Sequence, residues 1–466
     1  MQRKGLFHRG NRQSSMDMTQ GSLPRKIFLF SIPLMLSQIL QVTFNMADVA
    51  VVGKFSSAQA LGSVGSTSML VSLFTGFLIG MGSGVNVLVA QHLGAKRSRE
   101  TVETVHTSLL ICLLTGAIIS VLCLLLAQPM LTLMNTKEDL IDGAVLYFRI
   151  YALGMPALGV FNFGNGVMSA NGDTRRPLLY LTVAGVLNIF LNLFFVIVCG
   201  MAADGVALAS IISQYVSAIL IVVHLAREKD DCGLHLREMR FHPEQMRGVL
   251  VLGVPAGFQN AIFAIANIFI QTGLNSFDSV VVEGGSAASN ADTLIYNMMA
   301  AFYTACTSFM GQNWGAGKRD RVMRSYIISL IYATICGLTM GLFMVFFGET
   351  FLALFTNEPD VVATGMQRLR IMGFSYVIAP LMDCTIAASR GIGKSFGPTI
   401  IVILGSCVFR VIWVYTVFAH FHTIVSLYLL YAFSWAITGL AELAYFLKSY
   451  RDASPAGLGM HQGKIV

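Results

Sequence analysis

The sequence predicts an all-α membrane protein that crosses the bilayer many times. Of its 466 residues, 55% are hydrophobic and only 12% are charged, whereas soluble domains carry about 25% charged residues. The mean hydropathy is +0.68. The apolar residues gather into runs of about 20 residues, the length that a helix needs to cross a bilayer. A pattern in the first half also returns in the second half. We therefore expect twelve transmembrane helices in two lobes of six.

Twelve apolar segments reach the required length. They cover residues 26–52, 61–89, 103–127, 142–168, 178–200, 205–226, 247–273, 288–311, 323–347, 361–389, 398–418 and 424–447. The breaks on one side of the membrane hold turn residues and charges, as at 94–100 and 171–177. Such breaks are typical of tight connections between neighbouring helices.

Lysine and arginine indicate the orientation. They concentrate in both tails and in every second loop, whereas the alternate loops hold essentially Lys54 and Lys137. By the positive-inside rule, both termini are expected in the cytoplasm. The segment 1–20 is polar and contains no apolar stretch, so no cleaved signal peptide is expected. The expected location is the plasma membrane, which is the inner membrane in a bacterium.

The two halves share an internal repeat. Positions 90–97 match 311–318, and Gly172 matches Gly393. Each unit holds six spans, an even number that returns the chain to the same side. The lobes should therefore be related by a pseudo-two-fold axis along the membrane normal. The expected organisation is a cytoplasmic tail at 1–20, an N-lobe at 21–226, a cytoplasmic linker at 227–246, a C-lobe at 247–448 and a cytoplasmic tail at 449–466.

One carboxylate, Asp48, lies within the first apolar run, which extends from Ser31 to Gly53. A charge at membrane depth costs about 2.5–3.5 kcal/mol on insertion scales, so it usually faces a cavity and has a function. The alternative is an aspartate at the interface that reaches water past Lys54. Counted from Lys26 at about 1.5 Å per residue, Asp48 lies about 33 Å along the helix, in the outer part of the membrane.

Several motifs of soluble enzymes are incomplete. Residues 388–395 end like a Walker A loop, but the first glycine is missing and the repeat mate has Asp173 in place of the lysine. Gly76, Gly80 and Gly84 stand at small-xxx-small spacing, which predicts close helix packing instead of a dinucleotide loop. None of the eight cysteines forms a CxxC pair. No ATP-driven motor, cofactor or nucleic-acid partner is therefore expected.

Six short motifs together carry a resemblance to a known family. They are Ile32-Pro33 with Gln38, Asp48–Gly53, Val89–Ala95, Gly311–Gly317, Ala170–Thr174 and Arg390–Ser395. This combination resembles the multidrug and toxic compound extrusion (MATE) transporters, and the resemblance covers about residues 21–450. It implies secondary efflux of amphipathic, often cationic compounds, driven by inward H⁺ or Na⁺.

The resemblance also implies a cation site in the N-lobe. The family uses an acid in the first span, matched by Asp48, two polar residues four apart in the fifth, matched by Asn188 and Asn192, and a hydroxyl in the sixth, matched by Ser210. Positions i and i+4 share a helix face, and oxygen ligands suit a small hard cation or a proton. The alternative is ordinary hydrogen bonding between helices. A Na⁺ at Asp48 is the only metal ion that this pattern admits.

The chain departs from the family pattern at three points. Part of the family has a second acid in the fifth span, where this chain has Asn192. Another branch has a glutamate in the seventh span, where residues 257–263 hold no acid. The tenth-span acid of that branch lies about one turn before Asp383. The choice between H⁺ and Na⁺ therefore stays open.

A charged pair is predicted in the C-lobe. Asp383 lies seven residues before Arg390, and Arg410 lies twelve residues after Pro398. At about 1.5 Å per residue, the two side chains start about 10 and 18 Å deep in adjacent spans. We expect a buried ion pair between Asp383 and Arg410, which would lock the lobe or act as a second protonation or gating point.

A loose substrate cavity is predicted from adaptable side chains, because methionine and aromatic surfaces attract flat apolar cations. The candidates are Gln38, Tyr296, Met299, Phe302 and Tyr303. The alternative for residues at this helical spacing is core packing.

These features predict a cation-coupled efflux antiporter whose lobes rock around a central site. The expected partners are small-molecule substrates, chiefly amphipathic cations, and the lipid bilayer, and the chain is expected to act as a monomer. A flippase for a lipid-linked precursor is the first alternative, and it would need a cationic cavity. A membrane-embedded enzyme would need a catalytic dyad at membrane depth, and a channel is the third alternative.

Overall fold

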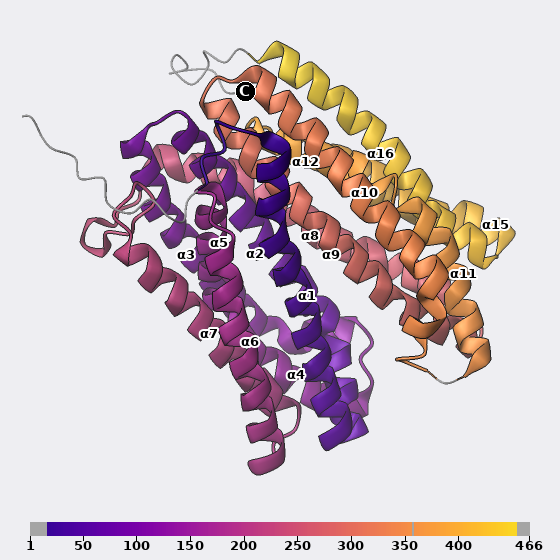
Figure 1. The fold of residues 1–466 in the computed structure, drawn as a ribbon. Coiled ribbons are helices and arrows are strands. Elements are labelled where there is room, and N and C mark those ends of the chain that lie inside the picture. The colour runs from indigo at the N-terminus through magenta and orange to yellow at the C-terminus, as the bar shows by residue number, and fades with distance from the viewer. Residues whose placement is uncertain (1–15, 357, 454–466) are drawn as a thin grey trace, which may run out of the picture.

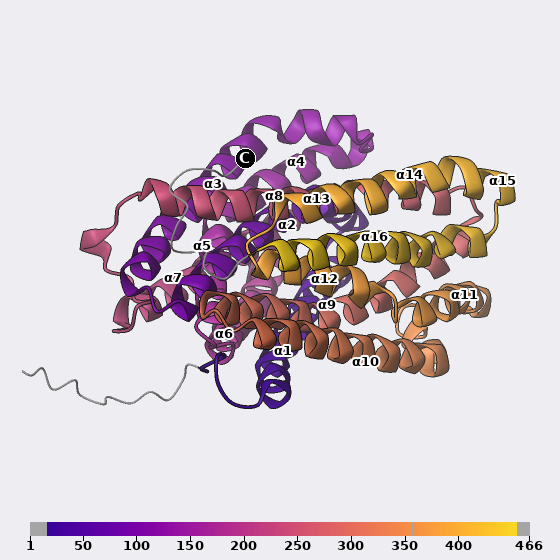
Figure 2. The same cartoon turned by 90° about the horizontal axis from the view of Figure 1, so that it is seen from above.

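The computed structural model describes residues 16–356 and 358–453, and within these ranges all regular elements are helices. Figure 1 shows two bundles, an N-terminal one from indigo to magenta and a C-terminal one from salmon to yellow. The bundles lie together at the end where the described chain begins and ends, and they diverge toward the opposite end. We call these the closed end and the open end. Figure 2 shows the same helices from above.

Within the described residues, the N-lobe contains seven α-helices and a short π-helical turn. They are α1 (Leu23–Phe55), α2 (Ala58–Gly94), α3 (Ser98–Leu133), α4 (Glu138–Ala152), α5 (Met155–Ala170), α6 (Arg175–Leu193), η1 (Phe194–Val198) and α7 (Ala203–Arg227). A linker with the short helix η2 (Leu236–Glu238) leads to the C-lobe.

The C-lobe repeats this order with more interruptions. Its elements are α8 (Pro243–Leu274), α9 (Ser279–Gly315), α10 (Arg319–Leu352), α11 (Pro359–Ser375), α12 (Ala379–Gly391), α13 (Phe396–Val402), η3 (Ile403–Val408), α14 (Phe409–Trp413), η4 (Val414–Phe418), α15 (Ala419–Phe421) and α16 (Ile424–Asp452). The elements η3 and η4 are π-helical.

The described helices account for the predicted spans. Nine are long and apolar enough to cross a membrane, and two bent pairs, α4 with α5 and α11 with α12, raise the number to eleven. Pro156 and Pro380 stand in the first turn after each bend, where the missing N–H of proline is tolerated. The remaining predicted span, 288–311, lies within α9, which is 37 residues long. The helix α9 contains the acids Glu283 and Asp292 and many small polar residues. It is therefore less apolar than the nine helices that are long and apolar enough to cross a membrane.

Glycines allow the two lobes to touch along α2. A Cβ added at Gly80 would lie 2.3 Å from the backbone N of Gly257, and one added at Gly84 would lie 2.5 Å from the backbone N of Gly253. Real Cβ atoms do not approach other backbone so closely, so α2 and α8 pack together only because side chains are missing there. The prediction that this glycine cluster serves close helix packing is confirmed.

The tightest of these glycine contacts between the lobes lies at the closed end, where α2 meets α9. A Cβ at Gly94 would lie 1.9 Å from the carbonyl oxygen of Gln312, and a Cβ at Gly315 would lie 2.0 Å from that of Gln91. Gly94 and Gly315 are mates in the repeat, so the contact is symmetric. Nearby, the rings of Phe30 in α1 and Phe309 in α9 meet edge to face at 5.5 Å.

We predict that Gly94→Ala destabilises the closed end, because the added methyl group cannot coexist with the Gln312 carbonyl. Overpacking costs about 1–3 kcal/mol, so the thermal unfolding midpoint of the purified protein should fall. Gly65→Ala is the matched control in the same helix, because nothing lies within 4 Å of its added Cβ. Equal midpoints for the two variants would contradict the contact.

Candidate functional site

The predicted N-lobe residues form one hydrogen-bonded cluster. Asn192 Nδ2 donates to Asp48 Oδ1 at 2.5 Å and to Asn188 Oδ1 at 3.2 Å, and Asn188 Nδ2 donates to Ser210 Oγ at 3.4 Å. The i, i+4 spacing places both asparagines on one face of α6, between α1 and α7. Asp48 lies seven residues before Phe55, about 10 Å from the open end of α1. The sequence therefore predicted correctly which side chains meet here.

The chemistry of this cluster fits a small hard cation or a proton. Asn192 and Asn188 are buried, with exposed fractions of 0% and 6%. The side-chain oxygen Oδ1 of Asn192 has no hydrogen-bond partner among the described residues. A buried amide oxygen without a partner, next to one carboxylate, is an oxygen donor set of the kind that Na⁺ accepts. The described residues contain no group of three or more His, Cys, Asp or Glu that could hold a metal ion.

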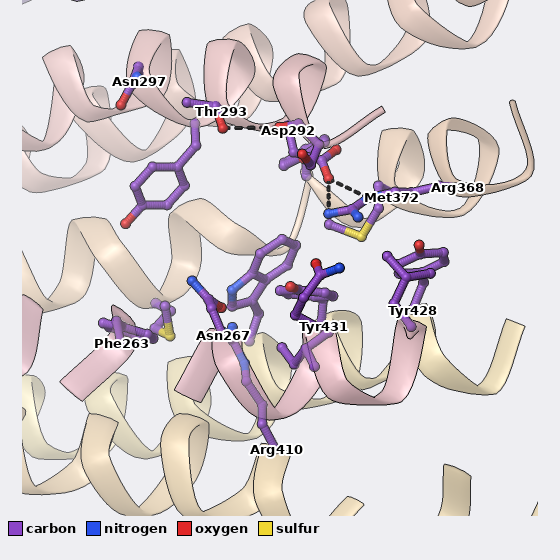
Figure 3. A pocket seen from close by; sticks show the side chains of 18 of the residues that line it. Phe263, Asn267, Asp292, Thr293, Asn297, Arg368, Met372, Arg410, Tyr428 and Tyr431 are labelled. Atoms are coloured by element: carbon purple, nitrogen blue, oxygen red, sulfur yellow. Dashed lines mark hydrogen bonds and ion pairs between the residues drawn. The ribbon is translucent and has the colours of Figure 1, made fainter. Parts of the chain in front are cut away.

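The C-lobe contains a cavity of about 450 Å³ between α8, α9, α11, α12, α14 and α16. Figure 3 shows side chains converging on it from several of these helices. Six aromatic residues line it, namely Phe263, Tyr296, Tyr376, Tyr428, Tyr431 and Trp435. Amide side chains add hydrogen-bonding groups, namely Asn260, Asn267, Gln271 and Asn297. Volume and lining are typical of a site for an aromatic small molecule.

An ion pair that the sequence did not predict, between Asp292 and Arg368, lies in this cavity. Arg368 of α11 binds Asp292 Oδ2 through Nε at 2.8 Å and through Nη2 at 2.7 Å, and its Nη1 donates to Gly285 O at 3.0 Å. The guanidinium also lies 4.8 Å above the ring of Tyr428. The available signal was a pair of opposite charges in two apolar spans, because a charge at membrane depth needs a partner.

The predicted ion pair between Asp383 and Arg410 is wrong for this structure. Arg410 Nε donates to Ser434 Oγ at 3.2 Å, and no ion pair within 4.0 Å joins Arg410 to a carboxylate among the described residues. Asp383 Oδ1 instead accepts from Tyr296 Oη at 3.4 Å. The physical reason is the π-helical element η3 before Arg410. Its wider turns rotate the residues that follow, whereas the prediction assumed an uninterrupted α-helix.

A second, smaller cavity of about 210 Å³ lies between the lobes. The N-lobe lines it with asparagines such as Asn86 and Asn162, and the C-lobe contributes Asp383 and Arg390. Arg390 Nη2 donates to Gln259 Oε1 at 2.8 Å. This cavity is where substrates of a two-lobe transporter are expected, at the interface between the repeats.

The predicted cavity residues divide into two groups. Tyr296 lines both cavities and Tyr303 lines the smaller one. Met299 and Phe302, with exposed fractions of 0% and 3%, pack in the core of the C-lobe and line neither cavity, so the packing alternative applies to them. Gln38 is half-buried on α1 and also lines neither.

One further carboxylate was not predicted. Glu442 of α16 is fully buried, and neither of its carboxylate oxygens has a hydrogen-bond partner among the described residues. It lies within the last predicted span, 424–447. Its depth was readable from the sequence, but the direction of its side chain was not.

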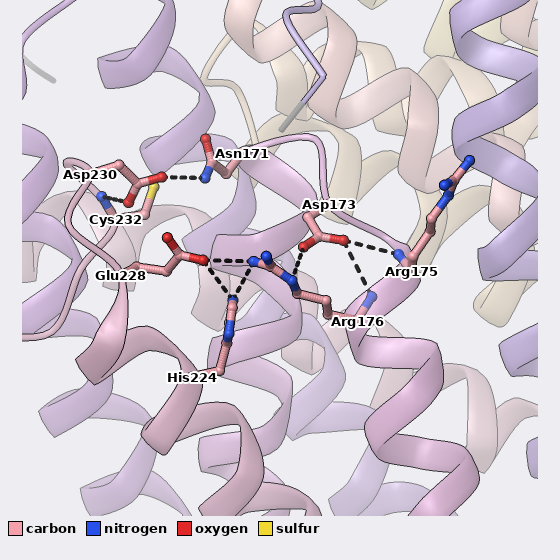
Figure 4. A network of polar contacts seen from close by, with 8 residues as sticks. All are labelled: Asn171, Asp173, Arg175, Arg176, His224, Glu228, Asp230 and Cys232. Atoms are coloured by element: carbon pink, nitrogen blue, oxygen red, sulfur yellow. Dashed lines mark hydrogen bonds and ion pairs between the residues drawn. The ribbon is translucent and has the colours of Figure 1, made fainter. Parts of the chain in front are cut away.

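A polar network fixes the closed end of the N-lobe (Figure 4). Asp173 Oδ1 accepts from the backbone N–H groups of Arg175 and Arg176 at 3.1 and 3.2 Å, and so caps α6. Arg176 Nη1 binds Glu228 Oε1 at 2.6 Å, and Glu228 also lies 3.2 Å from His224 Nε2. Burial raises the pKa of the Asp173 carboxyl above its ordinary value. The turn is therefore a structural connection, as predicted, and not a phosphate-binding loop.

Two lobes of membrane-length helices, with polar cavities inside and between them, define a multi-pass membrane transporter. The particular family follows from comparison with known proteins. The MatE family model matches residues 33–194 and again residues 255–416, so the chain belongs to this family. The two matches are equal in length and fall in corresponding parts of the two lobes, which confirms the internal repeat. MatE proteins are transporters and not enzymes, so the enzyme alternative is excluded.

Individual relatives agree with this assignment. A protein from Bacillus subtilis named "Probable multidrug resistance protein YpnP" is 30% identical over 77% of this chain and 80% of its own length. An "FAD transporter" from Shewanella oneidensis is 22% identical over 72% of this chain and 75% of its own length. The solved structure of an outward-facing MATE family transporter has a TM-score of 0.86, with 22% identity, covering 93% of this chain and 97% of that chain.

We predict that Asp292→Asn strongly destabilises the C-lobe, because it leaves the buried Arg368 guanidinium without its counter-charge. Breaking one member of a buried ion pair costs about 3–5 kcal/mol, so the thermal midpoint should drop clearly. The double variant Asp292→Leu with Arg368→Met should recover much of the loss. Glu103→Gln is the control, because it breaks the exposed pair with Arg99 and should leave the midpoint unchanged. A stable single variant would show that the pair is not needed.

Proposed function

We propose that the protein exports amphipathic aromatic compounds by antiport, and that H⁺ or Na⁺ drives the cycle by entering at the Asp48 cluster. Membership in a family of multidrug efflux transporters supports the transport activity. The observation that carries the coupling is the cluster itself, in which one carboxylate from α1 meets amide and hydroxyl groups from α6 and α7.

The cluster can convert cation binding into movement. Proton binding would neutralise Asp48, and Na⁺ binding would draw on Asp48 and Asn192 Oδ1. Either event changes the contact between α1 and α6, because the hydrogen bond from Asn192 depends on the carboxylate charge. A local change of charge then biases a two-state element, here the packing of α1 against its neighbours.

The contact between the lobes that must open and close during this cycle is a latch at the closed end. Gln91 Nε2 of the N-lobe donates to Gly391 O of the C-lobe at 2.9 Å, and its repeat mate Gln312 donates to Ala170 O at 2.6 Å. We call these four residues the latch. Alternating access requires it to open, so that substrate enters from one side and leaves by the other.

The charge pattern bears on the orientation of the protein in the membrane. Basic residues flank the closed end, so the positive-inside rule favours a cytoplasmic closed end with both termini there and a location in the plasma membrane, the inner membrane in a bacterium. The cation cluster and both cavities lie within a single chain, which favours a monomer. The relative named FAD transporter extends the proposed range of substrates beyond the amphipathic cations expected from the resemblance.

We predict that Asp48→Asn abolishes gradient-driven export. In proteoliposomes with an imposed ΔpH or Na⁺ gradient, the initial rate for a fluorescent substrate should fall at least tenfold, because no charge remains for the cation to neutralise. Glu349→Gln removes an exposed carboxylate on α10 and serves as the control. Export by Asp48→Asn at the wild-type rate under either gradient would refute the coupling proposal.

We predict that the double variant Gln91→Ala with Gln312→Ala opens the closed end. Each substitution removes one of the two symmetric hydrogen bonds, and Gln312→Ala also removes the hydrogen bond from Met18 N–H, so a population with separated lobes should appear. Spin labels at Arg99 and Asp320, exposed in the first turns of α3 and α10, should report a longer distance by electron resonance. Thr272→Ala, which removes an exposed hydrogen bond to the Ile268 carbonyl within α8, should leave the distance unchanged. If the double variant also leaves this distance unchanged, the latch does not hold the closed end together.

A further inference from the structure

We propose that the C-lobe cavity binds planar aromatic compounds that carry an anionic group, a phosphate or a carboxylate, and that Arg410 receives this group. The inference rests on the proposed function, because it names the substrate class of the transporter. It reverses the charge that the resemblance led us to expect.

The charge balance of the cavity is the first support. Its charged lining consists of Asp292, Arg368 and Arg410. Asp292 Oδ2 is held by two nitrogens of Arg368, so the two charges of this pair compensate each other, although Asp292 Oδ1 has no hydrogen-bond partner among the described residues. Arg410 is the charge that remains. A cationic compound would therefore meet a like charge in a setting of low dielectric, where repulsion is strong.

The environment of Arg410 is the second support. Its exposed fraction is 3%, yet no carboxylate lies within ion-pair distance in the described part of the chain. Its guanidinium lies 4.7 Å above the ring of Tyr431 and 5.5 Å above that of Phe263, and Nε is bound to Ser434. Buried charges are normally paired. An arginine held in place by two rings, with one nitrogen bonded to the protein, is ready to bind a phosphate or carboxylate with its outer nitrogens.

The nearby acids do not fill this role. Asp383 lines the smaller cavity between the lobes and is absent from the lining of the C-lobe cavity; it accepts its hydrogen bond from Tyr296. Glu442 lies fully buried in α16 and lines neither cavity. The missing counter-charge of Arg410 is therefore assigned to the ligand.

The start of the repeat gives a further support. When the two family matches are aligned from their first positions, 33 and 255, Asp48 of the N-lobe corresponds to Ile270 of the C-lobe. Ile270 lines the C-lobe cavity. At this position the carboxylate of the N-lobe cluster is thus replaced by an apolar side chain.

The aromatic walls define the rest of the ligand. Trp435 lies against Tyr431 and Tyr376 with ring centroids 5.5 and 5.8 Å apart, and Phe263 and Tyr296 also line the cavity. Such surfaces stack on flat ring systems. The amides Asn267 and Asn297 can bind polar ring edges. A tricyclic ring with a charged side chain matches both the volume and the lining.

Flavin mononucleotide and riboflavin form a matched pair of probes, because they share a tricyclic ring and differ by one phosphate. Binding to the purified full chain in detergent is measured by quenching of flavin fluorescence. We expect the wild type to bind flavin mononucleotide at least tenfold more tightly than riboflavin. Arg410→Gln should remove this preference while riboflavin still binds, which shows that the variant is folded. Arg410→Lys should retain a large part of the preference.

Two results would overturn the inference: equal affinity of the wild type for the two probes, or an unchanged preference in Arg410→Gln. Arg99→Gln controls for the loss of one positive charge at the surface and should keep the preference. Asp48→Asn should also keep it, because equilibrium binding needs no gradient. If Asp48→Asn exports normally but the preference depends on Arg410, the coupling proposal fails and this inference stands. If gradient-driven export depends on Asp48 but the preference ignores Arg410, only this inference fails.

Discussion

The contact of α2 with α9 at the closed end is the constraint on which the rest of the structure depends. Gly94 and Gly315 each lie against a glutamine carbonyl of the opposite lobe, at a distance that excludes any side chain. Because the two glycines are repeat mates, the same close contact between a glycine and a glutamine carbonyl occurs twice, once on each side of the pseudo-two-fold axis. Asn86 of α2 and Ser308 of α9 also meet each other across the lobes at 3.0 Å. The lobes therefore join at one end and diverge at the other (Figure 1).

This arrangement decides where polar groups can lie. Away from the closed end, each lobe must satisfy its own buried polar groups, since an unpaired charge at membrane depth is costly. The N-lobe does so with a cluster around Asp48, and the C-lobe does so with the pair Asp292–Arg368. Arg410 has no carboxylate partner among the described residues, and it faces a cavity. The two proposals thus assign a cation site to the N-lobe and an anion-binding cavity to the C-lobe.

Much of the fold and part of the site followed from the sequence. Apolar runs and the internal repeat predict helices and lobes because the bilayer fixes span length, and the i, i+4 spacing of Asn188 and Asn192 predicts a shared face. Rotation about the helix axis is not readable in this way. The π-helical element η3 turns Arg410 away from Asp383, and the partnership of Asp292 with Arg368 depends on how α9 and α11 face each other. A single sequence gives the depth of such residues but not their direction.

The central claim is that cation binding at Asp48 and closure at the latch are coupled. The most direct test follows the distance between spin labels at Arg99 and Asp320 while H⁺ or Na⁺ is titrated in lipid nanodiscs. In the wild type, one of these cations should shift the population between short and long distances. In Asp48→Asn, the population should not respond to that cation. The same response in both proteins would contradict the coupling, even with the fold and the latch intact.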